Sequence, residues 1–208
     1  KHENFLRNYV NKHFSACTRS KTRYNDFQNK NAAETAAKKH GEIKMLTNYH
    51  THTYRCGHAA AVPDEDYVRQ ALETGFQILG FSDHTPWPYR SGFLNPGVRM
   101  PLPELPEYLA SIRSLREKYA GKIQILLGLE CEYFPEYLDW LRGVRSELDY
   151  LILGNHFALT DEPGATAFSI ASTPEAVEEY TEDTLAGMRT GLFSYLAHPE
   201  LVLAQYPA

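Results

Sequence analysis

From residue 45 onward, the apolar positions of this chain follow two alternating patterns. Short apolar runs typical of buried strands are separated by longer segments in which apolar residues recur every three or four positions. The strand-like segments are 46–53, 77–82, 123–130, 150–155 and 193–197, and the helix-like segments are 63–74, 104–120, 135–148 and 173–190. Regular alternation of this kind predicts an α/β fold with a mostly parallel sheet.

Details within the segments support this prediction. The segment 104–120 places Leu105, Leu109, Ile112 and Leu115 at helical spacing, and an acidic first turn after Pro63 suits the positive end of a helix dipole. The strand 123–130 is almost entirely apolar, which predicts that it is covered on both faces. A long loop rich in Pro and Gly, residues 85–103, follows the second strand.

The first 44 residues differ in composition from the rest. They contain ten Lys or Arg against four Asp or Glu, whereas residues 45–208 contain eleven against twenty-two. Few apolar groups in this segment have regular spacing, so we expect residues 1–44 to be a solvated basic extension outside the catalytic fold, which would occupy 45–208. A nucleic-acid-binding arm is the less common alternative. Met45 directly precedes the first strand, and translation of the working domain is expected to begin there.

Composition narrows the class of protein. The hydrophobic content of 43% and the length of 208 residues suit one globular domain with a substantial core. No apolar run approaches the roughly 20 residues that span a bilayer, and no segment has the order of a signal peptide, which predicts a cytoplasmic protein without membrane contact. The three cysteines are far apart in sequence, so a disulfide framework is not expected. For Cys56 and Cys131 a small buried role is favoured over zinc binding.

Ligand-type side chains lie at the ends of the predicted strands. His50 and His52 form a His-x-His pair in the first strand, where alternation sends both to one face, and His58 follows closely. The other strand ends carry Asp83 and His84, Glu130, His156, and His198. A His-x-His pair alone can arise by chance, but the carboxyl ends of parallel strands meet at one face. The pattern predicts two or three metal ions bridged by a carboxylate, with Glu130 as the bridge.

These motifs resemble those of the polymerase-and-histidinol-phosphatase (PHP) superfamily, and within it the histidinol-phosphate phosphatases. The resemblance covers residues 45–208 and rests on His50-Thr51-His52-Thr53 with His58, on Gly80-Phe81-Ser82-Asp83-His84-Thr85-Pro86, on Gly128-Leu129-Glu130-Cys131-Glu132, on Gly154-Asn155-His156-Phe157 and on Ala197-His198-Pro199. It implies a distorted, TIM-like (β/α)7 barrel with a trinuclear site of zinc, manganese or iron that hydrolyses phosphomonoesters. The implied metal ligands are His50, His52, His58, His84, Glu130, His156 and His198.

One feature of the superfamily is missing from the sequence. Members carry a final Asp-x-His motif on a late strand, and no such motif follows His198. We therefore expect a barrel that is incomplete at its C-terminus. Its open edge would expose unpaired backbone groups and apolar surface, which favours homo-oligomers or other association through that edge.

The chemistry expected of this site follows from the charge of a phosphate ester. Clustered metals lower the pKa of a water and neutralise the phosphoryl oxygens. Glu130 and His84 would act at the catalytic centre, and Asp83 would orient an imidazole or cap a turn. Arg99 and Arg55 are the candidate substrate-binding residues, although each could be a surface charge. Glu132 and Glu136 are left out of the site, because Pro135 suggests that the strand ends before them.

The favoured substrate is a small phosphorylated molecule, L-histidinol phosphate, in histidine biosynthesis. Another PHP phosphoesterase activity, on a phosphotyrosyl protein or a nucleotide, is the first alternative, and a catalytically incomplete metal-binding fragment is the second. The acidic charge of residues 45–208 argues against nucleic acid as a partner.

Overall fold

The computed structural model describes residues 45–92, 97–158, 167–170 and 172–205. The chain divides into two units, Lys1–Leu46 and Thr47–Ala208. The predicted basic extension, 1–44, lies outside the described residues, and its separation from the catalytic fold stays a prediction.

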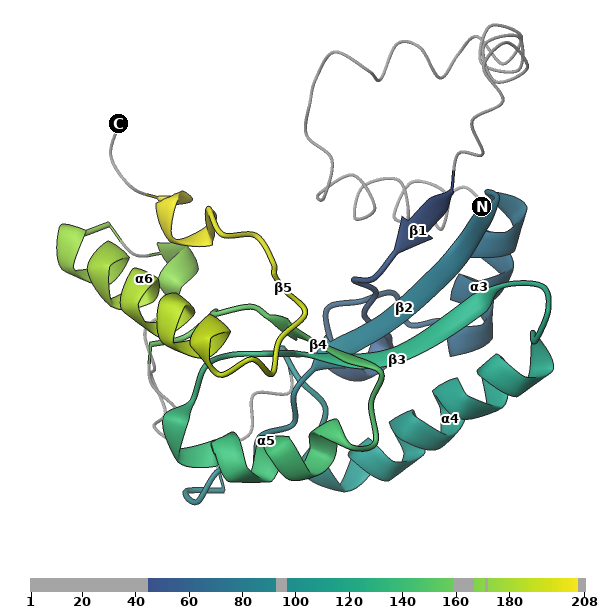
Figure 1. The fold of residues 1–208 in the computed structure, drawn as a ribbon, viewed down its shortest axis with the longest axis horizontal. Helices are drawn as coiled ribbons and strands as arrows, with labels where there is room; N and C mark the ends of the chain where they lie inside the picture. Colours follow the sequence, from purple (N-terminus) through teal and green to yellow (C-terminus); the bar gives the residue numbers. More distant parts are fainter. Residues whose placement is uncertain (1–44, 93–96, 159–166, 171, 206–208) are drawn as a thin grey trace, which may run out of the picture. The chain divides into compact units, whose positions relative to one another are not determined.

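The second unit is built on a parallel sheet with helices between its strands (Figure 1). The sheet order is β1-β2-β3-β4-β5, and the strands are β1 (Leu46–Asn48), β2 (Phe76–His84), β3 (Gln124–Cys131), β4 (Tyr150–Leu153) and β5 (Tyr195–Leu196). The helices are α3 (Asp64–Glu73), α4 (Leu105–Lys118), α5 (Leu138–Arg145) and α6 (Pro174–Arg189). The pairs β2–β3, β3–β4 and β4–β5 are all parallel. This five-stranded half-barrel confirms the predicted α/β fold and its incomplete barrel.

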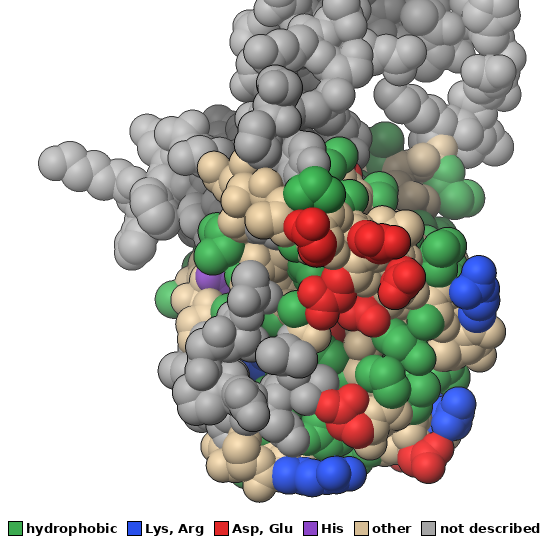
Figure 2. Space-filling model, turned by 90° about the vertical axis from the view of Figure 1, so that its left-hand side faces the viewer, with side chains coloured by type: hydrophobic (Ala, Val, Ile, Leu, Met, Phe, Trp, Pro, Cys, Tyr) green, Lys and Arg blue, Asp and Glu red, His purple; other side chains and the backbone are tan. Residues whose placement is uncertain are grey.

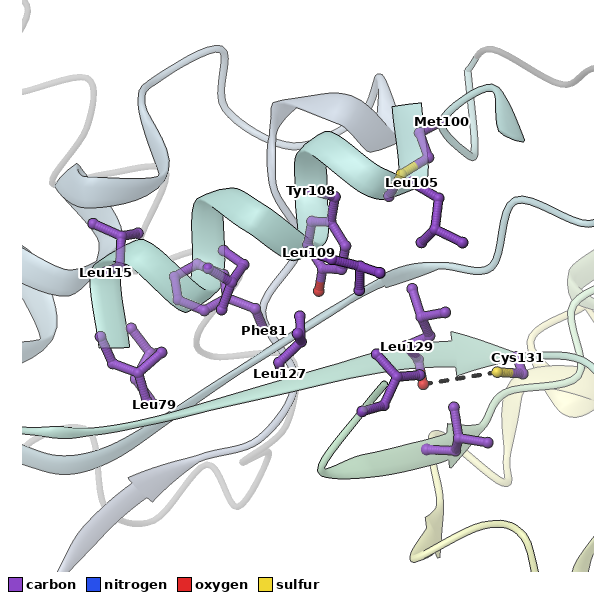
Figure 3. Close-up of a cluster of buried hydrophobic side chains, with 14 of the residues drawn as sticks. Leu79, Phe81, Met100, Leu105, Tyr108, Leu109, Leu115, Leu127, Leu129 and Cys131 are labelled. Carbon is purple, nitrogen blue, oxygen red and sulfur yellow. Dashed lines mark hydrogen bonds between the residues drawn. The ribbon is translucent and has the colours of Figure 1, made fainter. Parts of the chain in front are cut away.

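The main core lies between α4 and the two longest strands (Figure 3). From the strands, Leu79, Phe81, Leu127 and Leu129 point toward Tyr108, Leu109 and Leu115 of the helix. The four apolar positions predicted for this helix are all buried. Each fully buried Leu or Ile stabilises the folded state by about 1.5–3 kcal/mol. This core therefore holds α4 against β2 and β3 and fixes the positions of the two strand ends relative to each other. None of the described helices is both long and apolar enough to cross a membrane.

Tyr150 ties three neighbouring segments together inside the half-barrel. Its hydroxyl oxygen lies 2.7 Å from the carbonyl oxygen of Tyr49 and 3.0 Å from that of Phe81, and its single proton can be donated to either of them. The ring lies against Gly128, where a Cβ atom would come within 2.7 Å of it, so only glycine leaves room at that position. The segment that carries His50 and His52 is thereby anchored to β2 and β4.

The first strand is shorter than predicted. It ends at Asn48, not Thr53, because the side chain of Asn48 accepts a hydrogen bond from the backbone N–H of His50 and turns the chain out of the ladder. The Thr51 carbonyl still accepts from the N–H of Ser82. His50 and His52 therefore lie just beyond a strand end, as His156 and His198 do, whereas His84 and Glu130 belong to the last residues of their strands. The remaining elements agree with the predicted segments to within a few residues, except that 135–137 forms a separate 3-10 turn before α5.

Candidate metal centre

The parallel register brings the ends of the strands to one place. In the β2–β3 pair, His84 stands opposite Glu130, and Glu130 stands opposite Ile152 of β4. His156 follows β4, and His198 follows β5. Because all these strands run the same way, side chains distant in sequence converge beyond their carboxyl ends.

Glu130 is the centre of the cluster. Its carboxylate is 1% exposed and has five imidazoles around it. The nearest nitrogen–oxygen distances are 2.8 Å for His198, 3.0 Å for His50, 3.1 Å for His52, and 3.4 Å for both His84 and His156. Burial alone would raise the pKa of Glu130, but the surrounding imidazoles outweigh it and hold that pKa well below its usual range. Glu130 is therefore an ionised, buried carboxylate with two oxygens to share.

The histidines also approach one another. The Nε2 atoms of His50 and His52 are 3.0 Å apart and both face Glu130. Potential ligand atoms lie within 4.8 Å of one another in three groups built on the predicted ligands: His52, His58 and His84; His50, Glu130 and His198; and His84, Glu132 and His156. The structure therefore brings together all seven residues that the resemblance implies as metal ligands. Their role as ligands stays a prediction.

The donor set suits divalent metal ions. Imidazole nitrogens together with carboxylate oxygens are ligands for zinc, manganese and iron. Nδ1 of His198 is buried and has no hydrogen-bond partner among the described residues, and Nδ1 of His84 has no hydrogen bond there but lies 3.4 Å from Oε2 of Glu130. Burial lowers the pKa of His84 well below its usual value, so its imidazole is neutral and has a lone pair to donate. Unpaired buried nitrogens around an ionised carboxylate are what a bound cation would satisfy.

Glu132 lies in the cluster although the sequence analysis left it out. It is fully buried, and its Oε1 lies 3.3 Å from Nδ1 of His156. Trp87 Nε1 donates to its other oxygen at 2.8 Å. β3 does end before Glu132, at Cys131, as Pro135 suggested, but the residue that follows the strand still lies beside His156. The Glu-x-Glu spacing was the signal that could have identified it.

Asp83 holds the segment that carries His52. Its carboxylate accepts hydrogen bonds from both the backbone N–H and the hydroxyl of Thr53, and the side chain is completely buried. Burial raises the pKa of Asp83. One of its oxygens also lies within 4.8 Å of ligand-type atoms of His52 and Cys56. These bonds hold Thr53, the residue after His52, and the orienting role predicted for Asp83 stays a prediction.

The two arginines predicted to bind substrate are both buried in ion pairs. Arg55 is paired with Asp64, through two bonds of 2.9 Å, and with Glu107, through bonds of 2.7 and 3.0 Å. Nη1 also donates to the Thr53 hydroxyl, at 2.9 Å. A guanidinium has five N–H donors, and these five bonds use all of them. In this arrangement Arg55 has no donor left for a phosphate oxygen, so its contacts do not support the predicted role.

Arg99 lies closer to the cluster. Its Nη2 donates to Glu132 at 2.8 Å, and its Nη1 donates to the Thr85 carbonyl at 2.8 Å. Nε is buried without a partner among the described residues. Arg99 thus keeps an unused donor but is held by Glu132, and substrate binding by Arg99 stays a prediction.

The fold is an α/β half-barrel, and the ends of its strands surround one carboxylate with histidines. Such a site is suited to binding metal ions. The family model that matches the chain is the PHP domain, over residues 48–207. The match covers more than half of the sequence, and the chain belongs to the PHP family.

The curated relatives include histidinol phosphatases and probable phosphatases of no stated substrate. The chain is 34% identical over 171 residues to the "Probable histidinol-phosphatase" of Deinococcus radiodurans, an alignment that covers 75% of this chain and 61% of the relative. It is 32% identical over 120 residues to the "Histidinol-phosphatase" of Bacillus subtilis, covering 54% of this chain and 44% of the relative. The chain therefore spans less than two thirds of the relatives it matches.

A solved structure shows the same fold. The histidinol phosphate phosphatase of Lactococcus lactis, crystallised with zinc, L-histidinol and phosphate, superposes with a TM-score of 0.60 at 23% identity. The match covers 78% of this chain and 60% of that one. The predicted membership of the PHP family is confirmed by the family model, and the predicted type of fold by this solved structure.

Proposed function

We propose that residues 45–208 form a metal-dependent phosphoesterase domain that hydrolyses L-histidinol phosphate to L-histidinol and phosphate. The observation that carries the proposal is the buried Glu130 carboxylate with five imidazoles within 3.4 Å. Two or three divalent ions held by these side chains would supply positive charge for the phosphoryl oxygens and a water of lowered pKa. The named activity of the curated relatives supports the choice of substrate.

The side chains of the cluster would act by holding the metal ions, and with them the positive charge, in place. Glu130, buried and ionised, offers one oxygen to the side with His50 and His52 and the other to the side with His156 and His198. Such a placement suits a bridging role between neighbouring ions. Glu132, held by Arg99 and Trp87, would orient His156 through Nδ1, as outer carboxylates commonly do for histidine ligands.

The charge on one face of the described part is unsuited to nucleic acid. Figure 2 shows acidic side chains gathered on one face of the described part, with Lys and Arg side chains toward its border. A nucleic-acid site would need a basic surface that tracks the phosphate backbone. Metal ions bound by the clustered side chains would instead attract a single phosphate monoester to the site.

The proposal is tested by metal content and phosphate release together. Elemental analysis of the purified chain should find two or more zinc, manganese or iron ions per molecule, and release of phosphate from L-histidinol phosphate should stop after chelation and return with metal. Phosphotyrosine and a nucleoside monophosphate serve as alternative substrates. If the chain holds metal only at trace level, the metal-centre proposal is wrong. If metal binds and another ester is hydrolysed faster, the substrate is wrong.

Glu130→Gln provides the matched variant. It keeps the shape of the side chain but removes the charge, and we expect phosphate release to fall more than about 100-fold, because outer-sphere changes alone cost about 10–100-fold. Glu136→Gln is the control, since Glu136 belongs to the same segment and is exposed. Equal activity of the two variants would contradict the role proposed for Glu130.

A further inference from the structure

Cys56 contacts three of the clustered histidines. It is completely buried at the end of the 3-10 turn Tyr54–Cys56. Its Sγ lies 3.5 Å from Nδ1 of His52 and accepts the backbone N–H of His84 at 3.2 Å. Its carbonyl oxygen lies 2.9 Å from Nδ1 of His58.

The contact with His58 determines where that imidazole carries its proton. A carbonyl oxygen can only accept a hydrogen bond, so Nδ1 of His58 must be the protonated nitrogen, and Nε2 carries the lone pair. Gly57 makes this contact possible, because its φ of 73° turns the chain sharply after Cys56. That conformation favours glycine, and it directs the Cys56 carbonyl toward the following histidine.

The thiol of Cys56 contacts His52 as its carbonyl contacts His58. Nε2 of His52 faces Nε2 of His50 and Oε2 of Glu130, on the side of the proposed metal ions. A neutral imidazole has a single N–H. If Nε2 gives its lone pair to a metal, the proton lies on Nδ1 and is donated to Sγ of Cys56.

We propose that Cys56 is a positioning residue that holds His52 and His58 as their Nδ1-protonated tautomers, so that the Nε2 atoms of both are the ones offered to metal ions. Metal-binding histidines usually donate their second N–H to a carboxylate or a backbone carbonyl. Here one residue serves two histidines, with its thiol sulfur for His52 and its carbonyl for His58. This inference rests on the proposed function, since it presumes that the cluster binds metal.

Cys56→Ala removes the thiol and keeps the carbonyl, and Cys131→Ala is its matched control. Cys131 is equally buried, but its Sγ accepts from the hydroxyl of Thr85 at 2.8 Å and has no histidine partner among the hydrogen bonds of the described residues. Zinc affinity is measured on the full chain by competition with a chromophoric chelator. We expect Cys56→Ala to weaken zinc binding about 10–100-fold. Cys56→Ser, which keeps a hydrogen-bonding atom, should recover part of the loss, and Cys131→Ala should bind zinc as the unmodified chain does.

The tautomer is read directly from two-bond proton–nitrogen spectra of the metal-free chain labelled with ¹⁵N-histidine. The unmodified chain should show His52 and His58 protonated on Nδ1. In Cys56→Ala, His52 should shift toward the other tautomer while His58 keeps its own. General loosening of the core would not move one tautomer selectively, so this measurement separates positioning from a merely structural role.

Three results would overturn the inference. The first is an equal loss of zinc affinity in Cys56→Ala and Cys131→Ala, and the second is an unchanged His52 tautomer in Cys56→Ala. The third is a thiolate-to-metal absorption band in the cobalt-loaded chain that disappears in Cys56→Ala, because it would make Cys56 a ligand. If the unmodified chain binds zinc and releases phosphate in any of these cases, the proposed function stands and only the inference fails. If the unmodified chain binds none of zinc, manganese and iron, the proposed function fails as well.

Discussion

The buried pair formed by Arg99 and Glu132 should be essential for stability. The two side chains are 3% and 0% exposed, and their closest contact is 2.8 Å. A second bond of 3.2 Å joins Nη1 of Arg99 to Oε2 of Glu132. Arg99→Met keeps most of the apolar stem of the side chain but removes the guanidinium. Among the described residues, the buried Glu132 carboxylate would then keep Trp87 and His156 as its partners.

The expected size of the effect follows from the cost of an uncompensated buried charge. Breaking a buried pair by removing one partner costs about 3–5 kcal/mol, which is a large part of the roughly 5–15 kcal/mol that stabilises a typical domain. Burial would raise the pKa of Glu132, and Arg99 is the largest of the influences that hold this pKa below its usual range. The variant should therefore relieve part of the cost by taking up a proton on Glu132.

Urea unfolding, followed by circular dichroism, measures the change in the free energy of unfolding. A double-mutant cycle shows how much of this change belongs to the interaction between Arg99 and Glu132. We expect Arg99→Met to lower the free energy of unfolding by about 3–5 kcal/mol. The double variant Arg99→Met/Glu132→Gln should be about 1–3 kcal/mol more stable than the sum of the single effects. Arg142→Met is the control, because Arg142 and its partner Asp139 are 53% and 98% exposed and such pairs contribute about 0–1 kcal/mol.

A loss below about 1 kcal/mol for Arg99→Met, or strictly additive single effects, would refute this reasoning. The same variants also test the prediction that Arg99 binds substrate. If Arg99 contacts phosphate, Arg99→Met should raise the Michaelis constant for L-histidinol phosphate more than Glu132→Gln does. An unchanged Michaelis constant in a folded Arg99→Met variant would contradict substrate binding by Arg99.

Two further predictions follow from local geometry and from charge. Gly154→Ala would place a Cβ atom 2.9 Å from Cγ and Cδ of Glu130, so we expect about 1–3 kcal/mol of destabilisation and weaker zinc binding in a chelator competition. Gly143→Ala, in α5 with nothing within 4 Å, should instead stabilise by about 0.5–1 kcal/mol, and equal behaviour of the two would contradict the close approach at Gly154. Burial, together with Glu179 and Glu182, raises the pKa of Asp183 to about 6. A carboxyl group with a raised pKa favours folding at low pH, and this contribution to stability is lost as the pH rises through about 6. The Asp183→Asn variant should not show this loss of stability when thermal unfolding is measured at pH values from about 4 to 7.

Periodicity along the chain was sufficient to predict the elements and the class of fold. Strand and helix periods depend on neighbours within a few residues, so the apolar run before Glu130 and the helical spacing of Leu105, Leu109 and Ile112 could be interpreted without any knowledge of the tertiary structure. The convergence of the histidines was also predictable, because parallel strands place their carboxyl ends together whatever lies between them. For the same reason the early end of the first strand did not disturb the cluster, since His50 and His52 still follow a strand end.

Partners between distant residues were decided only by the tertiary structure. The sequence marks Arg55 and Arg99 as loop cations, but it cannot show that α3 and α4 supply Asp64 and Glu107 to the first, or that Glu132 is buried beside the second. Gly154 is likewise an ordinary glycine in the sequence, and its contact with Glu130 exists only because β3 and β4 are paired. Local pattern determines which residues reach the site, whereas packing between distant segments determines what each of them touches.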